Sequence, residues 1–194
     1  MYLTVRAIVL RVSEYNDRDA LLTVLTQNYG KLTIKARGLR RKNSPLVAPC
    51  QLLCYGEFTL FEYKGKYTIN EAHALELFQG LRRELTQLSL GSYFAQVTEL
   101  ISQEDMPNPE LQSLLLNCLY AMSSLGEPEN KVKAVFELRA ACLAGYTPEL
   151  FGCHICGSQT PDRFDLSQGQ LECHSCRDAE SSGIRVPVSP EMLE

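Results

Sequence analysis

The stretch Lys31-Leu32-Thr33-Ile34-Lys35-Ala36-Arg37 decides the fold of the first part of this chain, because its side chains alternate strictly between two kinds. Its even positions are apolar, and its odd positions are polar or cationic. A strand places successive side chains on opposite faces, so the alternation predicts a β-strand with one buried face and three cations on the other. Gly38 ends the predicted strand, and a basic loop follows from residue 39 to Ser44, just before Pro45.

The strand and the loop together carry six cations within twelve residues, which are Lys31, Lys35, Arg37, Arg40, Arg41 and Lys42. Such a run can be a solvated hairpin or a surface that neutralises phosphates. Because the period of two lines cations up on one face, we favour a nucleic-acid-binding surface made of these six residues.

The residues on either side of this stretch also favour β-structure. Segments 2–12 and 21–26 are rich in β-branched and aromatic residues, and turns are expected at residues 28–30 and 64–65. Five short strands fit before Ala74. A small curled sheet with a basic strand indicates an oligonucleotide-binding (OB) barrel, in which exposed aromatics stack on bases. Aromatics in strands are more often core, and the candidates for stacking here are Tyr29, Tyr55, Phe61, Tyr63 and Tyr67.

Beyond Ala74 the apolar period changes to that of helices. We expect helices at about 81–102, with a possible break at Gly91, from Asn108 and Pro109 to Gly126, and at about 128–144 before Gly145. The predicted fold class is therefore α+β. An N-terminal OB-fold nucleic-acid-binding domain (1–79) is followed by a helical domain (80–194) that carries a zinc module at 150–180.

The zinc module is predicted from two tight cysteine pairs, Cys153 with Cys156 and Cys173 with Cys176, which sixteen residues separate. Each C-x-x-C places two thiolates on one metal, and Gly157 supports the turn. Two disulfides or four unrelated thiols are the alternatives. The first twelve residues have no secretory layout, so we expect a cytoplasmic protein in which zinc is favoured over disulfides.

The ligand count indicates one structural Zn²⁺ per chain, because a catalytic zinc usually keeps one coordination position open. His154 and His174 can each replace a neighbouring thiolate, although four cysteines complete the shell without them. Cys118 and Cys142 lie on apolar helix stripes and are expected in the core. Cys50 and Cys54 receive no function.

The 194 residues have a net charge of −4, which conceals an uneven distribution. Residues 1–80 hold eleven Lys and Arg against seven Asp and Glu, whereas residues 81–194 hold eight against sixteen. Such asymmetry suggests separate tasks for the two halves. No apolar run approaches the roughly 20 residues needed to cross a bilayer, so no membrane partner is expected.

Signals for catalysis are few. The chain has no phosphate-binding G-x-x-x-x-G-K-[ST] loop, no G-x-S-x-G elbow and no H-E-x-x-H helix. His73 is the one histidine outside the zinc segment, so a Cys-His or Ser-His pair would depend on it alone. We therefore expect no enzyme.

Four segments resemble a known family, the bacterial DNA repair and recombination mediators of the RecO type. Residues 36–44 (ARGLRRKNS) are similar to the family's A-[KR]-G-x-R-[RK] segment. Residues 136–139 (FELR), followed by Gly145-Tyr146-x-Pro148-x-Leu150 and Cys153-x-x-Cys156-Gly157, are similar to its junction between helix and zinc module. The order of these segments is shared as well, and the resemblance covers nearly the whole chain.

The resemblance implies a bacterial, nucleoid-associated protein that binds single- and double-stranded DNA, anneals complementary strands and assists RecA loading in recombinational repair. It implies RecR and single-stranded DNA-binding protein as partners. Carried over to this chain, the DNA-binding segment falls on Lys35, Arg37, Arg40, Arg41 and Lys42, and the metal ligands fall on the four paired cysteines. Similar proteins continue past the Ser189-Pro190 signal, whereas this chain ends at Glu194, so it is either truncated or from a short lineage.

Two other functions stay open. In one, the chain is a protein-interaction adaptor with a structural zinc module and no direct nucleic-acid binding. In the other, it is a zinc hydrolase, which requires an open metal position.

Overall fold

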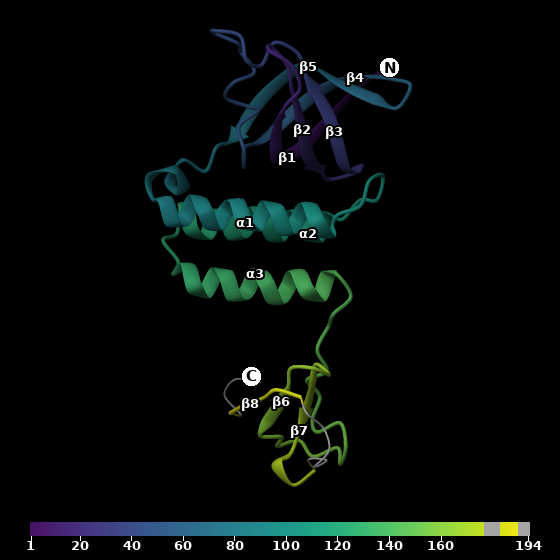
Figure 1. Cartoon of the computed structure of the whole chain (residues 1–194), viewed down its shortest axis with the longest axis vertical. Coiled ribbons are helices and arrows are strands. Elements are labelled where there is room, and N and C mark those ends of the chain that lie inside the picture. The colour runs from purple at the N-terminus through teal and green to yellow at the C-terminus, as the bar shows by residue number, and fades with distance from the viewer. Residues whose placement is uncertain (177–182, 190–194) are drawn as a thin grey trace. The chain divides into compact units, whose positions relative to one another are not determined.

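The computed structural model describes residues 1–176 and 183–189. Within it the chain forms two compact units, Met1–Ala140 and Ala141–Glu194 (Figure 1). The first unit holds a β-barrel and helices, and the second holds a small sheet and the paired cysteines.

Five strands form the barrel: β1 (Tyr2–Glu14), β2 (Ala20–Thr26), β3 (Gly30–Ala36), β4 (Tyr55–Tyr63) and β5 (Lys66–Glu76). The sheet closes in the order β1-β2-β3-β5-β4, and β4 pairs back onto β1. Every pairing is antiparallel except the one between β3 and β5. This confirms the predicted α+β class with an OB-like barrel at its N-terminal end.

The barrel interior is filled by alternate residues of each strand, as a period of two requires. The central part of β3 follows the expected pattern, since Leu32, Ile34 and Ala36 are buried while Thr33 is exposed. Cys50 and Cys54, in the connection between β3 and β4, are 2% and 0% exposed and belong to this core. Their role is therefore accounted for by packing in the barrel core, and no ligand is needed to explain them.

The helical part begins with a short 3₁₀ helix, η1 (Gln79–Arg83), followed by α1 (Leu85–Ile101), α2 (Pro109–Ser123) and α3 (Glu129–Leu143). Asn108 caps α2 as predicted, because its side chain accepts a hydrogen bond from the Leu111 amide at 3.0 Å. The expected break at Gly91 is wrong. Gly91 is buried inside an unbroken α1, and the change of helix type falls at Glu84.

Gly91 serves packing, since a Cβ at this position would lie 2.9 Å from Leu53 Cδ1 and 3.3 Å from Leu119 Cδ2. The missing side chain allows α1 to approach both neighbours closely. α1 also contacts β1, and α2 contacts β2. The buried Gln112 of α2 donates a 2.8 Å hydrogen bond to the Leu25 carbonyl of β2. The barrel and these helices therefore form one packed body.

α3 joins this body through an aromatic stack, in which the Phe94 and Phe136 rings lie with centroids 4.0 Å apart. Both rings are 0% exposed. No helix in the described part of the chain is long and apolar enough to span a bilayer.

The second unit contains a three-stranded sheet of β6 (Arg163–Asp165), β7 (Gln170–Glu172) and β8 (Arg185–Pro187), with β6 in the middle. A short 3₁₀ turn, η2 (His174–Cys176), follows β7.

In the first unit, the change from strands to helices falls between Glu76 and Gln79. The division of the chain into domains 1–79 and 80–194 stays a prediction.

Candidate nucleic-acid surface and metal centre

The outer face of β3 carries the cations that the sequence predicts on it. Lys31 and Lys35 are half-buried and Arg37, directly after the strand, is exposed. The adjoining strand β5 adds to this face, because Lys35 pairs with Thr68. Lys66 lies two residues before Thr68 and therefore points to the same side.

Lys35 is held in place by the loop between β1 and β2. Its ammonium lies 3.1 Å from Asp19 Oδ2 and 4.5 Å from the centroid of the Tyr15 ring. Asp19 also accepts hydrogen bonds from the Gly38 amide at 2.9 Å and from the Asn16 side chain at 3.1 Å. The Gly38 amide first, and then Lys35 and Asn16, lower the pKa of Asp19 to about 2. Asp19 therefore ties the β1–β2 loop to the end of β3.

Arg40 makes the second tie between these loops. Its guanidinium lies 2.9 Å from Glu14 Oε1 and donates to the Asn16 carbonyl at 3.2 Å. Its own backbone amide donates to the Arg18 carbonyl at 3.0 Å. This network fixes the position of the basic loop relative to β1.

Lys31 is directed away from solvent and toward α1. Its ammonium donates to the Glu99 carbonyl at 2.9 Å, in the last turn of that helix. The same carbonyl accepts a hydrogen bond from the Ser102 hydroxyl at 3.3 Å, and a cation at this position complements the negative end of the helix dipole. Lys31 thus links the barrel to the helices.

The other three cations differ from these. Among residues 1–176 and 183–189, Arg37, Arg41 and Lys42 form no ion pair or side-chain hydrogen bond, and all three are exposed. The loop that carries Arg41 and Lys42 is ordered by backbone bonds from the Arg41 amide to the Gly38 carbonyl, 3.1 Å, and from the Ser44 amide to the Arg41 carbonyl, 3.2 Å. An ordered loop with unpaired cations is suited to bind an anion.

Sequence reasoning missed three cations near this surface. Arg18 is exposed in the loop that Arg40 contacts, and Lys64 and Lys66 lie at the turn between β4 and β5. The signal that would have found them is topology, since the strand 2–3 face of OB barrels is flanked by the β1–β2 and β4–β5 loops.

The aromatic candidates divide by exposure. Tyr29, Phe61 and Tyr63 are 45%, 41% and 61% exposed, whereas Tyr67 packs against the barrel core and Tyr55 is half-buried. Tyr15, which the sequence did not single out, is 55% exposed and lies against Lys35. The Lys64 ammonium likewise lies 5.3 Å from the centroid of the Tyr63 ring, and exposed rings next to cations, such as Tyr15 and Tyr63, are suited to stack with unpaired bases.

The metal centre is formed by the two cysteine pairs of the second unit. The Sγ atoms of Cys153, Cys156, Cys173 and Cys176 all lie within 4.8 Å of one another. The Cys156 and Cys173 sulfurs are 3.9 Å apart, close to the ~3.8 Å edge of a tetrahedron with 2.3 Å metal–sulfur bonds. A disulfide requires about 2.0 Å, and all eight cysteines are free thiols. The four cysteines can therefore hold one metal ion.

The backbone around Cys153 favours a thiolate. Burial opposes ionisation of this thiol, but amides of Cys156, Ile155 and Cys173 point toward its sulfur and lower the pKa to about 6. The Gly157 amide closes the turn by donating to the Cys153 carbonyl at 2.8 Å, with Gly157 in the left-handed region at φ 73°. Turns of this kind present the sulfur to a metal.

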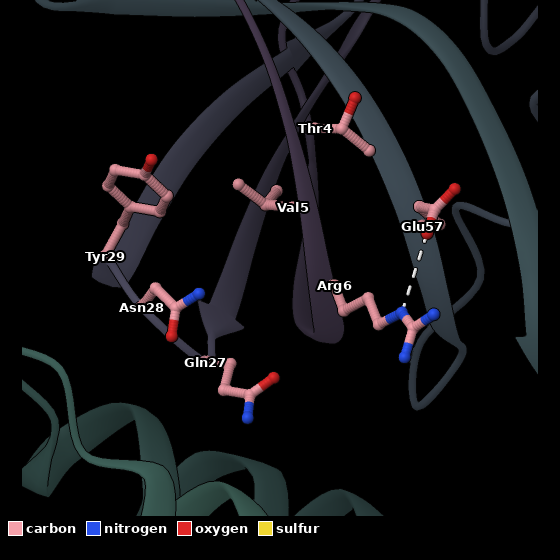
Figure 2. A pocket seen from close by; sticks show the side chains of 7 residues that line it. All are labelled: Thr4, Val5, Arg6, Gln27, Asn28, Tyr29 and Glu57. Atoms are coloured by element: carbon pink, nitrogen blue, oxygen red, sulfur yellow. Dashed lines mark ion pairs between the residues drawn. The ribbon is translucent and has the colours of Figure 1, made fainter.

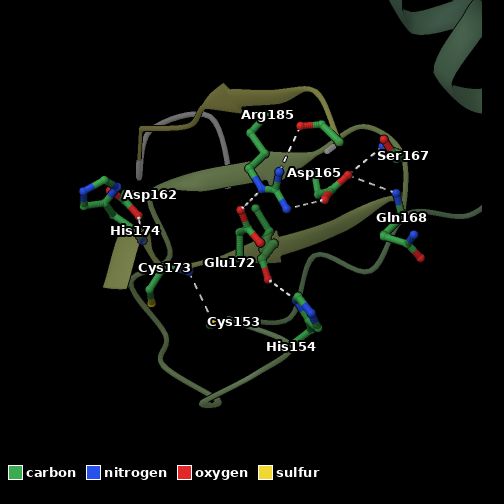
Figure 3. Close-up of polar contacts among 12 residues, drawn as sticks. Cys153, His154, Asp162, Asp165, Ser167, Gln168, Glu172, Cys173, His174 and Arg185 are labelled. Atoms are coloured by element: carbon green, nitrogen blue, oxygen red, sulfur yellow. Dashed lines mark hydrogen bonds and ion pairs between the residues drawn. The ribbon is translucent and has the colours of Figure 1, made fainter. Parts of the chain in front are cut away.

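The two histidines of the cysteine pairs stand outside the group of four sulfurs. The His154 ring lies 3.1 Å from the Leu171 carbonyl through Nδ1, and the His174 amide donates to Asp162 Oδ1 at 2.7 Å. Their contacts fasten the cysteine turns to the sheet (Figure 3).

A buried group of ion pairs lies in the small sheet next to the second cysteine pair. The Arg185 guanidinium lies between the Asp165 and Glu172 carboxylates, and these three side chains are at most 7% exposed (Figure 3). Glu172 directly precedes Cys173. The group therefore connects all three strands of the small sheet to the cysteine turn.

The remaining cysteines have the environment of core residues. Burial, and next the neighbouring Cys54 thiol, raise the pKa of Cys50 to about 12. Burial likewise raises the pKa values of Cys54 and Cys118 to about 11. Cys118 is 5% exposed as predicted for the core, and Cys142 is only half-buried. Protonated, enclosed thiols are neither ligands nor nucleophiles at neutral pH.

The chain matches two family models, one described as recombination protein O N-terminal over residues 1–78 and one as recombination protein O C-terminal over residues 82–194. It is 32% identical over 187 residues to the DNA repair protein RecO of Acetivibrio thermocellus, covering 95% of this chain and 74% of that protein. It is 31% identical over 190 residues to the protein of the same name from Alkaliphilus metalliredigens, covering 97% and 77%. The Bacillus subtilis protein is 28% identical over 185 residues, covering 95% and 71%.

Proposed function

The chain belongs to the RecO family of recombinational DNA repair proteins, and from this we propose that its barrel binds single- and double-stranded DNA through the cations of β3 and the following loop. We propose that it anneals complementary strands and assists the loading of RecA. RecR and single-stranded DNA-binding protein are the partners we infer for this task in the bacterial cytoplasm. The chain acts by binding and transferring strands, and no bond chemistry is assigned to it.

The observation that carries this proposal is the group of exposed cations without partners, Arg37, Arg41 and Lys42. In the described part of the chain these three cations are in no ion pair, so binding phosphate breaks no existing ion pair, and the ordered backbone of the loop keeps Arg41 and Lys42 close together. They lie where OB barrels bind oligonucleotides, beside the β1–β2 loop and the outer face of β3.

The six predicted DNA-binding cations then have different tasks. Arg37, Arg41 and Lys42 contact phosphates directly. Lys35 pairs with Asp19 and Arg40 pairs with Glu14, and these pairs hold the β1–β2 loop against the basic loop. Because a carboxylate partly neutralises each of these two cations, they attract phosphate less strongly than the unpaired ones. Lys31 anchors the start of β3 to α1.

The metal we assign to the four cysteines is one structural Zn²⁺ per chain. Four sulfur ligands fill a tetrahedral shell, which leaves no position for the water that a zinc hydrolase needs. When bound, the ion would cross-link the turn at Cys153 and Cys156 to the turn at Cys173 and Cys176. Residues of the small sheet then keep the module in one conformation.

The proposal is tested by measuring the affinity for a labelled single strand at several salt concentrations. If about five phosphates are contacted, log Kd should change with log salt with a slope of roughly 3 to 4, since each contact contributes ~0.7. The triple change Arg37→Ala, Arg41→Ala and Lys42→Ala, which removes the three cations assigned to direct phosphate contact, should weaken binding regardless of sequence and lower the slope by about 2.

Arg83→Ala is the matched control, because Arg83 is an exposed cation of η1 outside the barrel. It should leave the slope unchanged. A salt titration that is the same for the triple variant and the unchanged chain would contradict the assignment.

The second candidate function, an adaptor that binds a protein and no nucleic acid, is favoured by one observation. An apolar groove of about 310 Å³ lies between α2 and α3, lined by Leu114, Cys118, Val132 and Val135. The adaptor should show no salt-sensitive binding of the labelled strand, so the same titration separates the two functions.

Metal analysis and X-ray absorption test the zinc assignment. Fewer than four sulfur ligands on the metal would reopen a catalytic role for the site.

A further inference from the structure

A polar hollow of about 280 Å³ lies near the N-terminal end of β3, at the far end of that strand from the basic loop. It is formed by the first half of β1, the turn between β2 and β3, and β4 (Figure 2). Its lining residues are Thr4, Val5, Arg6, Gln27, Asn28, Tyr29 and Glu57. None of them is a metal ligand or one of the six predicted DNA-binding cations, and Tyr29 alone is among the aromatic candidates for stacking.

The turn that forms one wall of the hollow is rigid. The buried Thr26 hydroxyl donates to the Gly30 carbonyl at 2.8 Å and accepts from the Tyr29 amide at 2.9 Å. Gly30, at φ 66°, is packed so closely that a Cβ would lie 2.6 Å from the Met106 backbone. The side chains of this turn are thus presented from a fixed backbone, as a binding site requires.

Those side chains offer hydrogen bonds and a ring. In the part of the chain that the structure describes, the Gln27 and Asn28 amide groups have no side-chain hydrogen bond, and both residues are exposed. The Tyr29 ring is 45% exposed. Amide groups pair with the donor and acceptor edges of nucleobases, and an exposed tyrosine stacks on their faces.

The strand β1 contributes an open edge to the hollow. Its pairing with β2 begins at Ala7, and one further bond joins the Gln27 amide to the Arg6 carbonyl at 3.3 Å. Residues before Arg6 pair only with β4, so the backbone of Thr4 on the other edge is free to bond with a ligand.

The opposite wall indicates which part of a nucleotide fits. The Arg6 guanidinium lies 3.5 Å from Glu57 Oε2, and this pair is exposed to solvent (Figure 2). A carboxylate at the wall disfavours a phosphate and can accept a hydrogen bond from an exocyclic amine of a base. The hollow is therefore suited to a base more than to the backbone of DNA.

We propose that this hollow holds an unpaired nucleobase of a second DNA strand, while the basic surface holds the first; the inference rests on the proposed DNA-binding function. Two facts favour a second strand. β3 has seven residues, so the two sites lie about 20 Å apart along it. In the closed order of strands, β2 separates β3 from β1 and β5 separates it from β4, so the β1 and β4 walls of the hollow do not adjoin the strand that carries the basic surface.

A barrel that holds two strands at once has a direct use in annealing. One strand is bound electrostatically along its phosphates, and the other presents a base for pairing. Collisions between complementary bases then occur within one complex, which raises their effective concentration.

The test uses the full chain, a saturating unlabelled dT oligonucleotide and a labelled dC oligonucleotide as the second strand, because cytosine carries the exocyclic amine and cannot pair with thymine. Native mass spectrometry should find one chain with two strands, and anisotropy should give the affinity for the second. Tyr29→Ala should weaken binding of the second strand roughly tenfold, the loss of one base–aromatic stack, and leave the first strand unchanged.

Tyr29→Phe, which keeps the ring, should retain most of the second-strand affinity, and Tyr146→Ala is a control for an exposed tyrosine outside the barrel. An oligonucleotide with 5-iododeoxyuridine should cross-link to the peptide that contains Tyr29. Unchanged second-strand affinity in Tyr29→Ala, equal weakening of both strands, or an extended peptide competing in place of the second strand would each overturn the inference. Failure of the unchanged chain to bind any strand would instead overturn the proposed function.

Discussion

Asp19 determines how the two loops of the barrel meet. Its carboxylate accepts from the Gly38 amide and pairs with Lys35, which lies over the Tyr15 ring. Because these groups favour the charged form, the pKa of Asp19 falls to about 2, below the ~3.9 of an unfolded chain. Its contribution to stability is complete above about pH 4 and is lost as the pH falls toward 2.

The change Asp19→Asn tests this directly. Between pH 4 and pH 2 the urea midpoint of the unchanged chain should fall more steeply than that of the variant, which lacks the titrating carboxyl. The midpoint is followed by near-ultraviolet circular dichroism of the tyrosines. Asp17→Asn, in the same exposed loop, is the control and should follow the unchanged chain. Parallel curves for Asp19→Asn and the unchanged chain would show that Asp19 is not tied in this way.

The cations illustrate what the sequence can predict about single residues. A period of two was enough to place Lys31 and Lys35 on the outer side of β3. It was not enough to show that Lys31 is bonded to Glu99 or Lys35 to Asp19, because those partners are 68 and 16 positions away. Such contacts follow from the closed fold and not from the local pattern.

Helix ends were predictable where the capping chemistry is local. Asn108 and Pro109 start α2 as their residue types indicate. Gly91 was misread because glycine breaks helices on average, whereas here the absence of a side chain allows Leu53 and Leu119 to approach. Close packing between elements overrides the propensity of one residue.

The cap of α2 gives a prediction at this scale. Asn108→Ala removes the bond to the Leu111 amide and should lower the free energy of unfolding by about 1 kcal/mol. Chemical denaturation provides the measurement. Asn117→Ala, at an exposed position in the middle of the same helix, should be neutral or slightly stabilising, because alanine is the better helix former. Equal losses in both variants would argue against capping as the cause.

At the scale of the whole molecule, the two compact units differ in what stabilises them. The unit Met1–Ala140 has a barrel core and packed helices, whereas the unit that follows has a three-stranded sheet around its cysteines. With so small a core, we expect this unit to depend on the metal that we assign to its four cysteines, since a metal contributes on the order of 10 kcal/mol to folding in small zinc modules. The cysteine spacing predicted the ligands, but the support from Arg185 could not be predicted, since its two carboxylate partners come from other strands.

Removal of the metal should therefore unfold one unit and spare the other. After treatment with a strong chelator, we expect amide hydrogen exchange to become fast in residues 152–176 and to stay slow in β1 to β4. Cys156→Ser should give the same pattern together with a metal content below one per chain. Faster exchange throughout the barrel would show that its stability also requires the metal.

The pairing between β3 and β5 has a consequence for how the barrel assembles. Only Ile34 with Tyr67 and Lys35 with Thr68 make this parallel contact, whereas β2 and β3 are paired over seven positions. The β1–β2–β3 meander and the β4–β5 hairpin can each form from neighbouring segments. Joining them requires closure of the long connection between β3 and β4, which is entropically costly and slow. We therefore expect this seam to form last in folding and to separate first in the native protein, at the strand that carries the basic surface.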